Sequence, residues 1–412
     1  MNEPRSGSPL AVLATIAAML PITGCGDGMA VPTADGTAPE LATPAPLPAL
    51  PDTMTIDVAP PLQRFDSSTF NLITTIGKGR GVKSVQVSQR GDVAVACDLE
   101  GCAIWVIDCA SMTIRHQVAL DRHAVSGYND KGEVVNGCIA EKPVDCAIDP
   151  AGEYVYVSLY NGDAVVRHRI DGRPDTLPGA DRTFGATRID PDGSRVRLAL
   201  PAARTGHMPK MVSLVPGSDM VLASNWVSGT LTAFDRSTMK RVKDIPLGRG
   251  GRFPRGIAVD SVERRAYVNN MGGASVSVVD LDSLKVVRSM RISSNPGHIH
   301  LAADRRHFYI ADNVNRLFSK YAIADGSLQG QVRFDHNALL FGVDRREEVA
   351  VVLHWYHDLA SVVRLSDMRM IHQFPVRRPI GVSFTGDRCL ISTYGGGAGQ
   401  VSVWGDDSSG IR

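Results

Sequence analysis

A short β unit recurs along most of the chain, and this repetition constrains the fold more than any other feature of the sequence. Each copy has an alternating apolar strand, a polar turn that often contains glycine, and a second strand rich in Val, Tyr and Ala. We take the last apolar residue of each first strand as an anchor, which gives Val87, Ile148, Leu214, Val259, Leu301, Val343 and Phe384. The anchors are separated by 61, 66, 45, 42, 42 and 41 residues. The last four steps match a four-stranded blade of about 40–45 residues, and the first two carry insertions around Tyr128 and Pro178.

The pattern within each copy predicts how the copies assemble. Residues two positions before the anchors are all apolar, and residues one position before them are mostly small. Such a strand suits a place beside a crowded central axis. Fourth strands follow in the first six copies, and segment 72–76 can supply the fourth strand of the seventh, which closes the last open edge. We therefore predict an all-β domain over residues 69–412, a seven-bladed β-propeller of four-stranded blades closed by an N-terminal strand.

Two segments carry a resemblance to a known family. Residues 266–270 read Ala-Tyr-Val-Asn-Asn and residues 274–280 read Ala-Ser-Val-Ser-Val-Val-Asp, with degenerate copies at 155–158 and 308–313. These segments resemble the YVTN family of β-propeller repeat proteins, whose relatives include surface-layer propellers and propellers like the β-chain of quinohaemoprotein amine dehydrogenase. The resemblance covers roughly residues 70–405. It implies the fold more than an activity, because members include binding and scaffold proteins, redox-enzyme subunits and relatives of sugar lactonases.

The first 24 residues have the pattern of an export signal. An apolar run of 11 residues, 10–20, is too short to span about 30 Å of hydrocarbon but fits the hydrophobic region of a signal peptide. It is followed by Ile22-Thr23-Gly24-Cys25, which resembles the bacterial lipobox, in which the Cys is lipidated. This resemblance implies a lipoprotein signal peptide over 1–24 and lipid attachment at Cys25. Two or three acyl chains would suffice for stable anchoring in a membrane.

Residues 25–68 form a segment of different composition. Eight prolines and scattered Ala and Thr make it unable to bury much apolar surface, so we expect a disordered tether. In an extended form it would reach about 100 Å. The prediction is a propeller held at a distance from a membrane in the bacterial cell envelope, facing the periplasm or the exterior.

Cationic residues recur where the first strands begin. Four residues before the anchors stand Lys83, Lys210 and Arg255, and His298 lies in the equivalent part of a later copy. Since equivalent positions of all copies meet at one rim of a propeller, we expect these side chains to form a positive mouth at the axis. The loops after the second strands add Tyr160, Trp226 and Trp355 to the same rim. Aromatic faces beside cations fit an anionic or glycan-like ligand, although the same residues can simply cap the core and face solvent.

The sequence predicts a binding or scaffold module for a protein, a glycan or another anionic ligand, bound through this rim. The alternative is an enzyme or enzyme subunit, either a lactonase-like hydrolase or the propeller subunit of a redox complex. We assign no catalytic residue, no cofactor and no metal site, because the sequence has no CxxCH, P-loop or GxSxG motif. The pairs His298 with His300 and His354 with His357 lack a third ligand fixed by spacing. The Asp residues that recur at strand ends (Asp108, Asp171, Asp235, Asp280) are expected to shape turns.

Charge and cysteine content complete the expectations. The formal net charge is +1, which argues against a nucleic-acid partner, and we expect a monomer. Cys25 aside, six cysteines remain, an even number that permits disulfides in an exported chain. A bridge within the trio Cys97, Cys102 and Cys138 is predicted, because the first two flank a hairpin loop and the third enters the same rim. Cys146 and Cys389 occupy apolar strand positions and are expected to be buried thiols.

Overall fold

The structure is a computed structural model that describes residues 70–128, 134–293, 295–395 and 397–406. The predicted signal peptide, the tether and Cys25 lie outside the described residues. Strands dominate the described part, where the only helical element is a 3₁₀ turn, η1 (Trp355–His357). No helix in this part is long and apolar enough to cross a bilayer. The all-β prediction is therefore confirmed for the described residues.

The chain divides into two compact units. The smaller unit includes residues 124–138, which hold most of a hairpin made by β6 (Arg122–Tyr128) and β7 (Val134–Ala140). These two strands pair with each other in a two-stranded sheet. The insertion expected around Tyr128 is this hairpin.

Four sheets of the larger unit follow one simple plan, in which four consecutive strands pair antiparallel in chain order. The first sheet holds β13 (Pro209–Leu214), β14 (Met220–Asn225), β15 (Thr230–Asp235) and β16 (Lys240–Pro246). The second holds β17 (Pro254–Asp260), β18 (Arg265–Asn270), β19 (Ser275–Asp280) and β20 (Lys285–Arg291). The third holds β21 (Pro296–Leu301), β22 (His307–Asp312), β23 (Leu317–Ala322) and β24 (Leu328–Arg333). The fourth holds β25 (Leu340–Val343), β26 (Val349–His354), β27 (Leu359–Arg364) and β28 (Arg369–Pro375).

A fifth four-stranded sheet joins the two ends of the described chain. It contains β29 (Pro379–Thr385), β30 (Arg388–Thr393) and β31 (Gly399–Asp406), and its fourth strand is β1 (Phe70–Gly79). β1 pairs antiparallel with β31, and Ile76 lies opposite Val401. The prediction that segment 72–76 supplies this strand is confirmed.

The remaining strands of the larger unit form one nine-stranded sheet. One part of it holds β2 (Val82–Val87), β3 (Val93–Asp98), β4 (Ala103–Asp108) and β5 (Thr113–Leu120). Another part holds β8 (Pro143–Ile148), β9 (Tyr154–Leu159) and β10 (Ala164–Arg169). The insertion expected around Pro178 leads into a hairpin, β11 (Arg182–Ile189) and β12 (Arg195–Arg204). This hairpin bridges the two parts, because β12 pairs with β10 and β11 pairs with β5.

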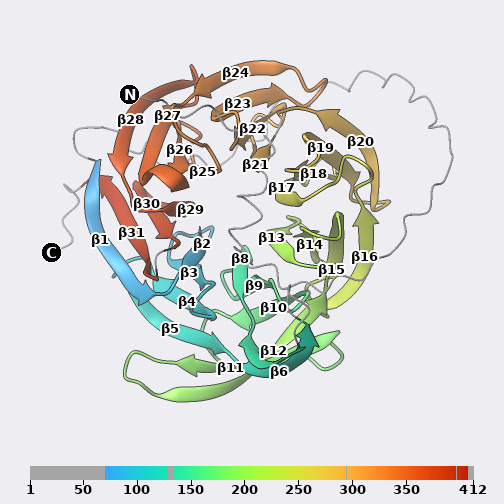
Figure 1. Cartoon of the computed structure of the whole chain (residues 1–412), viewed down its shortest axis with the longest axis vertical. Coiled ribbons are helices and arrows are strands. Elements are labelled where there is room, and N and C mark those ends of the chain that lie inside the picture. Colours follow the sequence, from blue (N-terminus) through green and yellow to red (C-terminus); the bar gives the residue numbers. More distant parts are fainter. Residues whose placement is uncertain (1–69, 129–133, 294, 396, 407–412) are drawn as a thin grey trace. The chain divides into compact units, whose positions relative to one another are not determined.

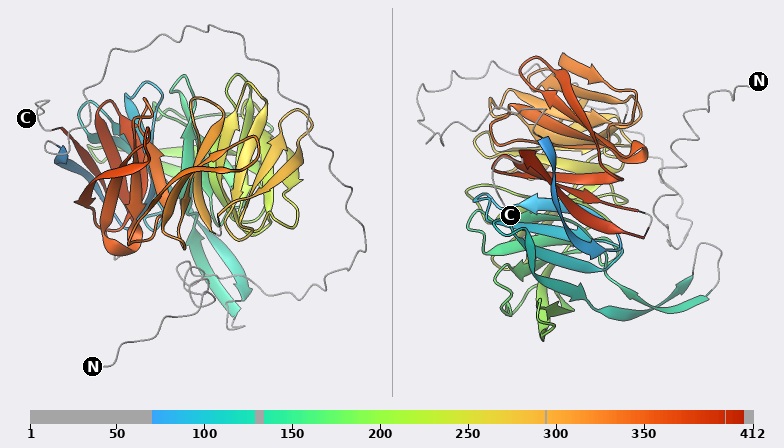
Figure 2. Two further views of the ribbon diagram at one scale, coloured as in Figure 1. Left: turned by 90° about the horizontal axis from the view of Figure 1, so that it is seen from above. Right: turned by 90° about the vertical axis from the view of Figure 1, so that its left-hand side faces the viewer.

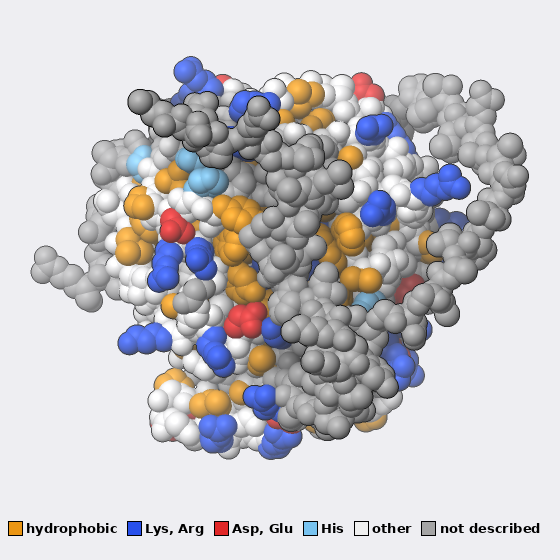
Figure 3. All heavy atoms as spheres, viewed as in Figure 1, with side chains coloured by type: hydrophobic (Ala, Val, Ile, Leu, Met, Phe, Trp, Pro, Cys, Tyr) orange, Lys and Arg blue, Asp and Glu red, His pale blue; other side chains and the backbone are white. Residues whose placement is uncertain are grey.

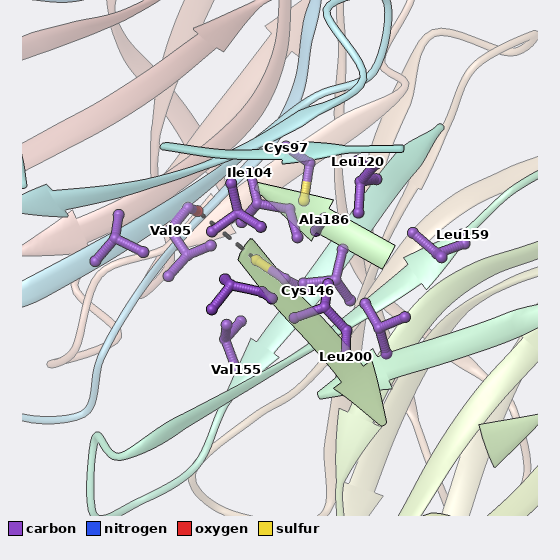
Figure 4. Close-up of a cluster of buried hydrophobic side chains, with 14 of the residues drawn as sticks. Val95, Cys97, Ile104, Leu120, Cys146, Val155, Leu159, Ala186 and Leu200 are labelled. Carbon is purple, nitrogen blue, oxygen red and sulfur yellow. Dashed lines mark hydrogen bonds between the residues drawn. The ribbon is translucent and has the colours of Figure 1, made fainter. Parts of the chain in front are cut away.

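The sheets of this unit stand around a central axis (Figures 1 and 2). Every predicted anchor is the last or the next-to-last residue of a strand beside that axis, and these strands are β2, β8, β13, β17, β21, β25 and β29. Each of them contacts the next one in chain order, and β29 contacts β2. Apolar side chains fill the space between neighbouring sheets. They also fill the space between the two parts of the nine-stranded sheet, where the cluster around Cys146 and Leu200 lies (Figure 4).

The recurring Asp residues shape turns, as expected. Asp108 accepts hydrogen bonds from the backbone N–H groups of Ala110 and Ser111, at 3.0 and 2.9 Å. Asp235 does the same for Ser237 and Thr238, at 2.8 and 2.9 Å. A carboxylate that satisfies the backbone two and three residues later stabilises a tight turn, so these side chains are occupied by a structural role.

Candidate functional site

The structure brings three of the predicted cations close enough to influence one another. Lys83 lies on β2, Lys210 on β13 and Arg255 on β17. Burial and the charges of Lys83 and Arg255 hold the pKa of Lys210 well below its usual value. Burial, together with Arg255, lowers the pKa of Lys83 to about 7, although Glu100 opposes the shift. We call these three side chains the axial cation cluster.

Charge is costly in the surroundings of the axial cation cluster. Lys83 and Arg255 keep part of their surface accessible, yet loss of hydration lowers the pKa of both, to about 7 for Lys83 and about 10 for Arg255. Lys210 is more enclosed, with 6% of its surface exposed. The three side chains therefore share surroundings in which a charge is poorly hydrated.

Aromatic rings cover the two lysines of the cluster. The Lys210 ammonium nitrogen lies 4.2 Å from the ring centre of Tyr160 and 5.4 Å from that of Trp226. Lys83 lies 4.9 Å from the ring centre of Tyr394. Such contacts favour the charged amine modestly, and they confine each amine between a ring and the axis.

Trp355 lies in the same loops but contacts aromatic residues instead of a lysine. Its indole Nε1 donates a hydrogen bond to the Tyr394 carbonyl at 2.8 Å, and its ring stands 6.4 Å from that of Tyr394. The Tyr394 hydroxyl hydrogen-bonds to Glu100 at 3.0 Å, and Glu100 in turn pairs with Lys142. Trp355 therefore supports the ring that covers Lys83.

Two serines that the sequence did not single out hold the backbone of the cluster. The Ser158 hydroxyl on β9 donates to the Lys210 carbonyl at 2.8 Å. The Ser224 hydroxyl on β14 donates to the Arg255 carbonyl at 2.7 Å. Both serines are fully buried. The same type of hydrogen bond thus occurs in two neighbouring sheets and holds the backbone at Lys210 and at Arg255.

A buried carboxyl group faces the cluster. Asp145 on β8 is 2% exposed and accepts a hydrogen bond from the Val212 backbone N–H at 3.2 Å. Burial raises the pKa of Asp145 to about 7, against the opposing effects of its hydrogen bonds and Arg255. The sequence search overlooked it because it stands three residues before its anchor, one position away from the cationic residues. Repeating the spacing comparison at that position would have shown Asp145 and His298 together.

Replacing Asp145 with Asn should reduce the pH dependence of stability between about pH 4 and 7. The folded protein holds this proton up to about pH 7, whereas the ordinary pKa of a free Asp is 3.8. Rising pH across that window therefore lowers the free energy of unfolding, and Asn removes this term. Relative to the Asn variant, the free energy of unfolding of the unsubstituted protein should fall by on the order of 1–3 kcal/mol between pH 4.5 and 7, as measured by urea unfolding. A stability difference between the two proteins that is the same at both pH values would contradict this assignment.

His298 adds a neutral ring at the axis. Burial, with Arg255 next in effect, lowers its pKa to about 3, so this side chain carries no charge at neutral pH. Its ring packs edge-on against Phe341 at 5.1 Å, and its buried Nδ1 has no hydrogen-bond partner among the described residues. The structure therefore places His298 near the cluster, but not as a fourth cation.

Comparison with known proteins identifies the architecture. No protein-family model matches the chain, and no curated protein sequence matches it. A solved structure of hydrazine synthase from Kuenenia stuttgartiensis aligns with a TM-score of 0.59 at 13% identity, covering 78% of this chain and 95% of that one. The β-propeller domain of Cps50 (Swd1) from Myceliophteria thermophila aligns with a TM-score of 0.60 at 12% identity, covering 82% and 99%. The larger unit is a β-propeller. These identities are too low to carry more than the fold.

The second predicted histidine pair, His354 and His357, is occupied by hydrogen bonds. His354 is completely buried, and its two ring nitrogens bond to the Asn337 carbonyl at 2.5 Å and the Ser361 hydroxyl at 2.7 Å. His357 bonds to the Asn337 side chain at 3.1 Å. Across the described part of the chain, no three His, Cys, Asp or Glu side chains converge in a group suited to a metal ion.

The cysteines of the propeller are free thiols where the structure describes them. Cys97 lies buried on β3, while Cys102 lies in the turn before β4, and the Cys138 side chain is outside the described residues. The disulfide within this trio therefore remains a prediction. The expected burial of Cys146 and Cys389 is confirmed, at 1% and 0% exposure. Cys97 is a hydrogen-bond neighbour of Cys146, and this contact, with burial, raises the pKa of Cys146 (Figure 4).

Proposed function

We propose that this protein is a binding module whose propeller takes an anionic ligand at the axial cation cluster. The observation that carries the proposal is that Lys83, Lys210 and Arg255 form no ion pair with any described residue. Elsewhere in the described propeller, arginines commonly pair with nearby carboxylates. Three buried or half-buried cations without such partners are costly, and an anionic ligand would relieve that cost.

The arrangement of the ring supports seven blades. The inner strands beside the central axis contact one another in a closed series. The nine-stranded sheet would supply two blades, and β12 would be the outer strand of the second. Under this interpretation the axial cations come from the first, third and fourth blades. An experimentally determined map with a different number of sheets around the axis would contradict the count.

We further propose that the propeller acts at the bacterial cell envelope as a lipid-anchored, monomeric member of the YVTN family. The support is the lipobox-like segment before Cys25, the composition of residues 25–68 and the repeats at 266–280. The partner would be an envelope protein or glycan with acidic groups, and the membrane would be contacted through the lipid. Metabolic labelling with a radioactive fatty acid tests the anchor, since Cys25→Ala should abolish incorporation.

Binding at the axis is tested by removing charge there and elsewhere. The double variant Lys210→Ala/Arg255→Ala should lower the affinity for anions at least tenfold, because it removes two unpaired cationic side chains from poorly hydrated positions at the axis. The matched control is Lys285→Ala/Arg291→Ala, which removes one lysine and one arginine from exposed positions of β20. Calorimetric titration with citrate and with an acidic oligosaccharide provides the measurement. Equal affinities in both double variants would exclude the axial cation cluster as the site.

A further inference from the structure

We propose that the axial ligand is a carboxylate joined to an apolar body, with the carboxylate among Lys83, Lys210 and Arg255 and the apolar part against Leu339 and its aromatic neighbours. This inference rests on the proposed function and narrows its ligand class. It follows from how charged and apolar groups are divided around the axis.

The apolar side of the axis is built from the positions equivalent to the cations. Four residues before their anchors, the other copies carry Val144, Gly297, Leu339 and Ile380. Leu339 is only partly buried and packs in one cluster with Trp355 and Tyr394, which are also partly buried. Figure 3 shows hydrophobic side chains gathered near the centre of the ring on the side of β25 and β29.

The charged and apolar sides are continuous. Tyr394 belongs to the apolar cluster and also covers Lys83. On the other flank, a Cβ added to Gly297 would lie 3.2 Å from Leu339 Cδ1, and the next residue, His298, is within the electrostatic influence of Arg255. A ligand at the axis would therefore meet cations and partly exposed apolar side chains next to one another.

The cost of charge at the axis favours a singly charged head group. Burial and mutual repulsion lower the pKa of both lysines, to about 7 for Lys83, and Asp145 acts against this effect at Arg255. Glu100 is the acidic neighbour of Lys83, and His298 is neutral. One arriving carboxylate would offset the repulsion between the cations, so that an amine takes up a proton on binding.

The experiment compares four probes on the purified protein by isothermal titration calorimetry at pH 7. Hexanoate carries both features, acetate carries the charge alone, hexan-1-ol carries the chain alone, and inorganic phosphate tests a compact oxyanion. We expect hexanoate to bind at least tenfold more tightly than acetate or hexan-1-ol, since each buried methylene contributes roughly a fourfold gain. Repeating the titration in buffers of different ionisation enthalpy should reveal proton uptake with hexanoate.

Variants place the ligand and separate the possible failures. Lys210→Met keeps the bulk of the side chain, and it should weaken hexanoate binding about tenfold and reduce the proton uptake. Leu339→Ala should weaken hexanoate binding severalfold and leave acetate binding unchanged, while Lys285→Ala/Arg291→Ala should change neither.

Phosphate binding that is tighter than hexanoate binding, and that is lost in Lys210→Ala/Arg255→Ala, would overturn this inference and leave the proposed function standing. Equal binding of hexanoate and hexan-1-ol would overturn the carboxylate assignment, and binding of no anion to the axis would overturn both proposals.

Discussion

Replacing Ile76 with Asp should cost the protein roughly 4 kcal/mol or more, because it places an unpaired carboxylate inside the seam that closes the ring. Ile76 is 3% exposed and lies opposite Val401 of β31. Both residues belong to one apolar cluster with Trp105 of β4. β1 thus binds the last sheet through its hydrogen bonds and also packs on the sheet that follows it in the ring.

Thr75→Asp provides the matched control, since the neighbouring residue points to solvent on the opposite face of the same strand. Its effect should stay within about 0.5 kcal/mol. Urea unfolding followed by tryptophan fluorescence measures the stability of both variants. Trp105 belongs to the affected cluster, and Trp404 lies on β31, the strand that pairs with β1. If Ile76→Asp is insoluble, Ile76→Ala should still cost roughly 2–4 kcal/mol. A loss below about 1 kcal/mol in Ile76→Ala would show that this seam contributes little to stability.

Most of the fold could be predicted because repetition makes each copy evidence for the others. The anchors from Val87 to Phe384 all fall at the ends of inner strands, and the closing strand was found from the missing partner of β31. Repetition could not predict with which strands the irregular segments pair. The hairpin β11–β12 joins the two parts of the nine-stranded sheet by pairing with β5 and β10, and the hairpin itself shares no repeated pattern with the other copies.

The candidate site was predicted in its positions but not in its charge states. The spacing located Lys83, Lys210 and Arg255 correctly at one axis, yet a sequence gives no measure of hydration. In the structure, burial and mutual repulsion lower the pKa of both lysines, and His298 is neutral. Ser158 and Ser224 were missed for a related reason, because a small buried hydroxyl acquires its role only from the neighbouring sheet that it contacts.

A buried ion pair beyond the axis should produce the second large effect. Arg167 on β10 forms two hydrogen bonds with Asp175, at 2.7 and 2.9 Å, and their side chains are 8% and 7% exposed. Arg167 also donates to the Arg236 carbonyl beyond β15 at 3.0 Å and lies over the ring of Tyr154. It therefore connects the loop after β10 with the next sheet.

Asp175→Ala should destabilise the protein by roughly 3–5 kcal/mol, because the Arg167 guanidinium would remain buried without its partner. The double variant Arg167→Met/Asp175→Leu removes both charges and should recover most of that loss, since desolvation offsets much of the attraction in the native pair. Asp367→Ala is the control at an exposed pair of the same bidentate geometry, formed with Arg364, and it should cost less than about 1 kcal/mol. Urea unfolding of the four proteins measures these differences. A double variant as unstable as Asp175→Ala would mean that the pair acts through its shape and its bond to Arg236 rather than through uncompensated charge.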